Sequence, residues 1–212
     1  MHTARLSLLA AGLTLALAGC AGPEAHRHGA GPGAGPAAGM HGHAQGPGMG
    51  GDGKGMGMGM GAGRMAMASL GPTQGNTVRG LVVFHQMADG QVMVHARVSG
   101  LKPNGEHGFH IHEKGDCAST DGTSAGGHFN PDGKPHGPQT AAHHAGDMPS
   151  LKADANGMAD QKFTLSGGPS VAAGAASVVG RSVIVHANPD DYATQPTGNA
   201  GGRLACGVIA GH

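Results

Sequence analysis

Short runs of alternating apolar and polar residues make up most of the chain after Gly63. Such alternation, together with many β-branched residues, is typical of strands that bury one face. Turn-forming sequences such as Ala88-Asp89-Gly90 separate several of these runs. No segment carries apolar residues at helical spacing for long enough to form a major helix. The predicted strands are residues 64–70, 77–84, 91–99, 108–112, 158–165, 182–186 and 204–209.

This series of short strands indicates an all-β domain and favours an antiparallel sandwich or barrel. Two long intervals, residues 114–151 and 187–203, interrupt the series. Loops of this length in a compact domain are usually functional or disordered. The first interval contains most of the candidate metal ligands described below, so we expect it to be ordered.

The first 20 residues have the features of an export signal. Arg5 gives a positive start, residues 6–17 form an apolar stretch too short to cross a membrane comfortably, and small residues precede Cys20. This order resembles a bacterial lipoprotein signal peptide, residues 1–19, in which Cys20 is lipidated and becomes the new N-terminus. Ala21 favours the outer membrane, facing the periplasm, in a Gram-negative cell, and the outer face of the membrane in a Gram-positive cell. The alternative is an ordinary secretory signal in which Cys20 is incidental.

Residues 20–63 form a Gly-rich segment with Pro, Ala, Met and His but almost no large aliphatic residues. This composition cannot bury enough apolar surface to fold, so we predict a disordered linker before a domain at residues 64–212. Imidazole and thioether groups bind copper, so the linker either gathers metal or serves only as a spacer. The groups concerned are His26-Arg27-His28, His41-Gly42-His43 and Met56-Gly57-Met58-Gly59-Met60.

Composition excludes one class of partner and suggests one cross-link. Lys and Arg number 13, Asp and Glu also 13, and there is no Trp, so the chain lacks the basic and aromatic residues typical of nucleic-acid binding. Export would place the protein in an oxidising compartment, where disulfides persist. Cys117 and Cys206 are the only cysteines besides Cys20, so we expect them to pair, with two unpaired thiols as the alternative.

Seven potential metal ligands lie in the second half of the chain. His110 and His112 are one residue apart on a predicted strand, so their side chains share a face, and His186 ends another strand. Copper(II) favours such a nitrogen-rich, tetragonal site. The loop residues supply three nitrogens and one carboxylate, a set suited to tetrahedral zinc. These loop residues are His128, His136, His144 and Asp147, whereas His85, His95, His107 and His143 are expected to have no ligand role.

These ligands stand within sequence motifs that resemble copper,zinc superoxide dismutases over about residues 64–212. The resemblance is specific because the motifs are long and occur in the family's order. They are Gly108-Phe109-His110-Ile111-His112-Glu113, Ser124-Ala125-Gly126-Gly127-His128-Phe129-Asn130-Pro131, His144-Ala145-Gly146-Asp147, Val185-His186-Ala187-Asn188-Pro189-Asp190-Asp191 and Gly198-Asn199-Ala200-Gly201-Gly202-Arg203-Leu204-Ala205-Cys206-Gly207-Val208-Ile209. The resemblance implies an eight-stranded antiparallel Greek-key barrel or sandwich.

The resemblance also implies a role for each site residue. Copper would be bound by His110, His112, His128 and His186, and zinc by His128, His136, His144 and Asp147, so that His128 is shared. Asp190 would link His110 and His136 and orient both rings. Arg203 would dock the substrate anion, and Cys117 and Cys206 match the family's disulfide. His128 and Arg203 are therefore the expected catalytic residues.

The expected function is dismutation of superoxide to dioxygen and hydrogen peroxide outside the cytoplasm. Residues 187–203 contain no Lys, so the charged residues that guide superoxide in animal enzymes are not evident there, and Lys114 and Lys134 are candidates to replace them. The alternative is a copper-binding or copper-delivery lipoprotein with the same fold and no turnover. Expected partners are superoxide, a membrane through Cys20 and a possible copper donor, with the protein a monomer or a homodimer.

Overall fold

The computed structural model describes residues 63–212. The predicted signal peptide, the lipidation of Cys20 and all but the last residue of the predicted linker lie outside the described residues. Among residues 63–212, no helix is both long and apolar enough to span a membrane.

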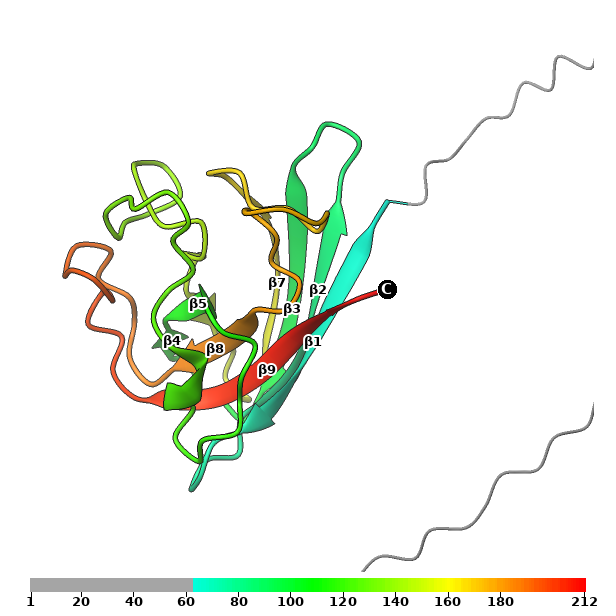
Figure 1. Cartoon of the computed structure of the whole chain (residues 1–212). Helices are drawn as coiled ribbons and strands as arrows, with labels where there is room; N and C mark the ends of the chain where they lie inside the picture. The colour runs from blue at the N-terminus through cyan, green and yellow to red at the C-terminus, as the bar shows by residue number, and fades with distance from the viewer. Residues whose placement is uncertain (1–62) are drawn as a thin grey trace, which may run out of the picture. The chain divides into compact units, whose positions relative to one another are not determined.

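Seven antiparallel strands form one curled sheet in the order β5-β8-β9-β1-β2-β3-β7, which Figure 1 shows as a partly closed barrel. A second sheet pairs two short strands, β4 and β6. The strands are β1 (Met65–Pro72), β2 (Arg79–Gln86), β3 (Val92–Ser99), β4 (Glu106–His107), β5 (Phe109–His112), β6 (Leu151–Lys152), β7 (Ala159–Leu165), β8 (Ser182–His186) and β9 (Arg203–Gly211).

The core follows from the alternation along these strands. In β3 every second residue is buried, and the same alternation covers Ala66–Leu70 of β1 and Val82–Phe84 of β2, with half-buried or exposed residues between. Phe84, Val94 and Ala66 are fully buried on the inner face of these strands. Phe109 and Ile111 extend the same apolar cluster to β5. Burial of these side chains provides the main stabilisation of the barrel.

The predicted strands agree closely with the structure. All seven are present, and their ends differ from the predicted ends by at most two residues. The predicted all-β, antiparallel fold is therefore confirmed. The resemblance implied eight strands, whereas the main sheet has seven and a second sheet has two. The other two strands, β4 and β6, have two residues each, which is too short to produce a periodic pattern.

Two long connections extend from the same region of the barrel, beside β5 and β8 (Figure 1). The first spans residues 113–150 and contains one short 3-10 helix, η1 (Thr123–Ala125), and the second spans residues 187–202. Hydrogen bonds join the two connections, because the His136 N–H donates to Gln195 Oε1 at 2.8 Å and Gln195 Nε2 donates to the His136 carbonyl at 2.9 Å. The Cys117–Cys206 disulfide ties the first connection to β9, as predicted.

Candidate metal centre

The first group of ligands lies where β5, β8 and the first long connection meet. His110 and His112 stand on β5, and His186 ends the adjacent strand β8. The connection returns to the outer edge of β5, where His128 forms a backbone bridge with His112. All four rings are buried, and each offers a nitrogen within 4.8 Å of the others. Three segments far apart in sequence thus bring four imidazoles together.

Backbone carbonyls fix the orientation of two of these rings. His112 Nδ1 lies 2.9 Å from the Gly126 carbonyl, and His186 Nδ1 lies 3.2 Å from the Gly201 carbonyl. Each carbonyl accepts a hydrogen bond from the Nδ1–H, which leaves Nε2 as the ring atom with a free lone pair. The two Nε2 atoms lie 3.4 Å apart and face the same space.

The second group gathers around the Asp147 carboxylate. Asp147 Oδ1 lies 2.8 Å from His128 Nδ1, 3.0 Å from His136 Nδ1 and 3.3 Å from His144 Nδ1. Backbone N–H groups of His144 and Gly137 donate to Oδ2 at 2.9 and 3.1 Å. Asp147 is therefore locked in place by the backbone, and its other oxygen is directed at three imidazole nitrogens.

Unpartnered ring nitrogens show that both groups fit metal ions. Within residues 63–212, four buried side-chain nitrogens have no hydrogen-bond partner: His110 Nδ1, His128 Nε2, His136 Nδ1 and His107 Nε2. His136 Nδ1 is close to Asp147 but without hydrogen-bond geometry. Buried polar atoms without a partner are costly, and a metal ion would supply one for the first three. Four nitrogens suit copper, and three nitrogens with a carboxylate suit zinc.

Asp190 connects the two groups. Its Oδ2 lies 2.6 Å from His110 Nε2, its Oδ1 lies 2.9 Å from His136 Nε2, and the Tyr192 N–H donates to Oδ1 at 2.7 Å. Burial alone would raise the pKa of this carboxyl. The hydrogen bonds from His110 and His136 lower the pKa by more than burial raises it, so the carboxylate stays ionised. One carboxylate thus orients a ring of each group and directs both Nδ1 atoms away from itself.

Burial prepares the first group for metal binding. It lowers the pKa of His110 to about 4 and of His186 to about 3, and it lowers the pKa of His112 well below the ordinary value. Neutral imidazole is the form that binds metal, so these rings need no deprotonation at neutral pH. His136 differs, because the nearby carboxylates of Asp147 and Asp190 outweigh the effect of burial and raise its pKa to about 9. A metal at its Nδ1 would displace a proton.

Arg203 places a positive charge beside the first group. It begins β9, and its backbone lies opposite His186 in the β8–β9 register. Its guanidinium donates to the Gly122 carbonyl at 2.6 Å and to the Gly126 carbonyl at 2.7 Å. The Gly126 carbonyl also accepts from His112, so one backbone group positions the arginine and a ring of the first group. Burial lowers the pKa of Arg203 from its ordinary value, but a guanidinium stays charged at neutral pH.

Two histidines that we expected to have no special role are buried. His107, on β4, donates from Nδ1 to the His186 carbonyl at 2.8 Å and so supports the backbone of a first-group residue. His143 Nδ1 donates to the Ala141 carbonyl at 2.6 Å. Neither belongs to the two groups. The sequence carries no signal for the His107 contact, because its partner is 79 residues away.

The structure also bears on the lysines considered for guiding the substrate. Lys134 forms an ion pair with Asp132 at 3.0 Å, so its charge is largely compensated. Lys114 is exposed. Arg203 is thus the cation with the most direct connection to the first group.

A curled antiparallel barrel with two histidine-rich groups that share His128 defines a class of protein with paired metal sites. A family model described as "Copper/zinc superoxide dismutase (SODC)" matches residues 78–209, within the predicted domain. "Superoxide dismutase [Cu-Zn] 2" of Brassica juncea is 45% identical over 151 residues, which cover 68% of this chain and 95% of that protein. The chain therefore belongs to the copper/zinc superoxide dismutase family.

Solved structures agree with this assignment. The crystal structure of the clock protein EA4 matches with a TM-score of 0.63 and 39% identity, covering 70% of this chain and 95% of that one. A double mutant of a SOD-like protein from Bacillus subtilis matches with a TM-score of 0.62 and 36% identity, covering 68% of this chain and 96% of that one. The predicted Greek-key barrel, superoxide dismutase activity and use of copper and zinc are confirmed at the level of the family.

Proposed function

We propose that this chain dismutates superoxide outside the cytoplasm, with one copper and one zinc that share the His128 imidazole. Copper would bind His110 Nδ1 and the Nε2 atoms of His112, His128 and His186. The observation that carries this proposal is the difference between the two buried His128 nitrogens: Nδ1 lies 2.8 Å from Asp147 Oδ1, and Nε2 has no hydrogen-bond partner among residues 63–212. Zinc would bind Asp147 Oδ1 and the Nδ1 atoms of His128, His136 and His144.

The reaction consumes two superoxide anions and two protons and yields one dioxygen and one hydrogen peroxide. Bound copper supplies the reversible one-electron change, and bound zinc polarises the shared ring. His128 is suited to hold a proton at Nε2 and to pass it to the reduced substrate, because Nε2 is the nitrogen that faces the first group. Asp147 retains the ring during this exchange through its contact with Nδ1.

Arg203 would receive the anion beside the first group. Its two hydrogen bonds to Gly122 and Gly126 hold the guanidinium still, so little side-chain entropy is lost when superoxide arrives. Its charge is close enough to His112 and His186 to lower the pKa of both rings, after the larger effect of burial. A fixed positive charge at this position raises the local concentration of an anionic substrate.

Replacing Arg203 with alanine tests this role in the metal-loaded protein. We expect kcat/KM for superoxide to fall on the order of tenfold or more, because local positive charge accelerates anion association by about that factor. Arg203→Lys keeps the positive charge without the paired hydrogen bonds. This variant should retain part of the wild-type kcat/KM, and its kcat/KM should still fall as the salt concentration rises. Pulse radiolysis at several ionic strengths measures both quantities. Equal rates in wild type and Arg203→Ala, at equal metal content, would contradict the role.

A non-catalytic copper carrier is the second candidate. Both ligand groups and Arg203 are retained in the chain, which favours turnover over simple storage. The metal-loaded wild-type protein separates the two directly. Full copper and zinc occupancy without superoxide removal would establish the carrier and exclude the enzyme.

The proposed location is the outer membrane, facing the periplasm, with Cys20 as the lipid anchor and residues 20–63 as the linker. Support comes from the sequence alone: a positive start, a short apolar stretch and a cysteine after small residues. Changing Cys20 to serine should release the protein from the membrane fraction into the soluble periplasm, because lipidation requires the thiol. Metabolic labelling with a fatty acid gives the matched readout. Unchanged membrane association of the Cys20→Ser variant would reject the anchor.

A further inference from the structure

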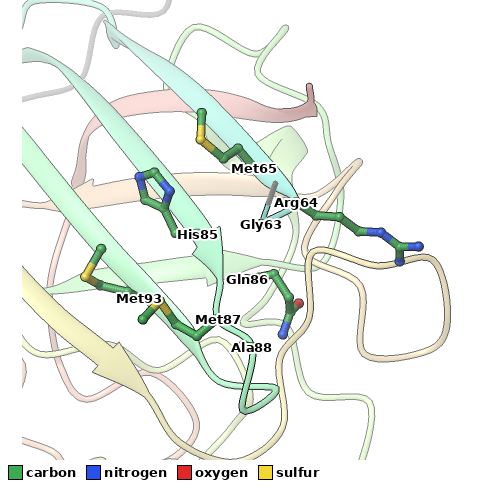
Figure 2. Close-up of a pocket in the computed structure, with 8 residues that line it drawn as sticks. All are labelled: Gly63, Arg64, Met65, His85, Gln86, Met87, Ala88 and Met93. Carbon is green, nitrogen blue, oxygen red and sulfur yellow. The ribbon is translucent and has the colours of Figure 1, made fainter. Parts of the chain in front are cut away.

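The outer face of the barrel carries a second cluster of side chains of the types that can bind copper. This cluster is far in sequence from the histidine motifs. Met65 on β1 lies directly opposite His85 on β2, and His85 lies directly opposite Met93 on β3. Met87 follows His85 by two residues, just beyond the end of β2. The four residues line one open pocket, shown in Figure 2. We call them the methionine row.

The register directs Met65, His85 and Met93 outward, and Met87, just beyond β2, is 44% exposed. Directly paired residues in an antiparallel sheet point to the same face, and their Cβ atoms lie about 4.5–5.5 Å apart. The neighbours of the row along each strand, Ala66, Phe84 and Val94, are fully buried on the inner face. Figure 2 shows Met65, His85 and Met93 side by side on adjacent strands, projecting to the same side.

The chemistry of the row suits a soft monovalent metal. Three thioether sulfurs and one imidazole nitrogen are uncharged donors that favour Cu(I). No Asp or Glu lines the pocket, so hard cations such as calcium or magnesium lack their carboxylate ligands. Arg64 also lines the pocket, but its guanidinium points away from the sulfur atoms (Figure 2).

The next row along the same strands makes a useful contrast. There, Met67 is paired with Val83, which in turn is paired with His95. The central position is therefore an aliphatic residue, and the His95 ring is already held by Asp160 at 2.7 Å. Only the first row places an imidazole between two thioethers. On its other side, the His212 N–H donates to the Met65 carbonyl at 3.0 Å, which adds a second histidine beside the row.

We propose that the methionine row binds one Cu(I) ion, with His85 as the central ligand and Met65, Met87 and Met93 as thioether ligands. This site is separate from the two histidine groups, which are built on β5, β8 and the long connections. It holds copper at the surface as a binding site and has no part in superoxide turnover.

Titration of the full-length, copper- and zinc-loaded protein with Cu(I) tests this site. The titration is done without oxygen and against a colorimetric Cu(I) chelator, so that affinity and stoichiometry are both measured. Met65→Leu, Met87→Leu and Met93→Leu together should remove one equivalent of bound Cu(I), since leucine keeps the apolar volume without the sulfur. His85→Ala should weaken the site at least about 10- to 100-fold, as even supporting groups of metal sites have effects of this size.

The matched control is Met158→Leu. Met158 is 52% exposed, more than Met87, and belongs to no such row, so its loss should leave Cu(I) binding unchanged. Superoxide dismutation should remain at the wild-type level in the triple variant, which separates this site from the proposed function. If the triple variant binds as many Cu(I) ions as wild type with equal affinity, the proposal fails. The proposal also fails if the triple variant binds Cu(I) as wild type does and differs only in its self-association, measured by sedimentation. That result would identify the methionine row as a contact between two copies of the protein.

Methionine-methyl NMR with Ag(I), a diamagnetic substitute for Cu(I), gives a residue-specific readout on the same protein. The methyl signals of Met65, Met87 and Met93 should shift together and reach their end point at the same equivalent of silver. Met148 is fully buried in the core and serves as the internal reference that should not move. Shifts confined to other methionines would overturn the assignment of the ligands.

Discussion

Replacing His186 with alanine is expected to abolish superoxide removal and to lower copper affinity by at least about 100-fold, the upper range for loss of even a supporting group. His186 Nε2 lies 3.4 Å from His112 Nε2, and its Nδ1 is held by the Gly201 carbonyl. Alanine cannot replace this nitrogen, so the first group would keep three ligands. His186 is absent from the second group, and zinc occupancy should therefore remain at the wild-type level.

The complementary variant makes the prediction sharper. His144→Ala should lower zinc occupancy and leave copper bound, because His144 belongs only to the second group. His95→Ala is the control, since its ring is held by Asp160 on the outer face of the sheet and belongs to neither group. Elemental analysis and a superoxide assay on the three variants supply the measurements. Copper retention with full activity in His186→Ala would show that the copper ligand set is wrong.

Among the variants proposed for this protein, removal of the disulfide is expected to lower the free energy of unfolding the most. Cys117 and Cys206 close a loop with a sequence separation of 89 residues. In the chain-entropy model, such a loop gives roughly 4–5 kcal/mol of stabilisation by restricting the unfolded chain. Cys117→Ser with Cys206→Ser should therefore lower the unfolding free energy by about that amount and Tm by about 10–20 °C.

The same variant should also affect the first ligand group. The connection that contains Cys117 includes the Gly122 and Gly126 carbonyls, which hold Arg203 in place. Without the covalent tie we expect these contacts to weaken and activity to fall further than metal content. Calorimetry with and without metals is required, because bound metal itself stabilises the folded state. A reductant should lower the Tm of wild type but not that of the double variant. Equal Tm values for wild type and the double variant in the absence of reductant would contradict the prediction.

Much of the barrel could be predicted because its signals are local. Alternation with a period of two identifies the buried face of a strand from a few neighbouring residues, as along β1, β2 and β3. The one-residue spacing of His110 and His112 fixes their common face in the same way. The short strands β4 and β6 have no such pattern, and they form only because the rest of the fold brings them together.

The candidate site was predicted partly from donor chemistry and partly from its resemblance to a family. Donor chemistry alone separates a nitrogen-rich set from a set that includes Asp147, but it does not say which histidine is shared. The resemblance supplied His128, Asp190 and Arg203, and the structure adds the contacts that these residues make. The role of the buried His107 was missed because its partner, the His186 carbonyl, is 79 residues away, and no local sequence pattern indicates such a contact.

The sequence by itself determined the strand pattern and the types of ligand available, and it favoured the pairing of Cys117 with Cys206. Tertiary structure alone decided which ring nitrogen faces each group, how one Asp190 carboxylate reaches two rings, and that His85 stands between Met65 and Met93. The physical reason is that strand periodicity depends on neighbouring residues, whereas register and ring orientation depend on hydrogen bonds between segments tens of residues apart.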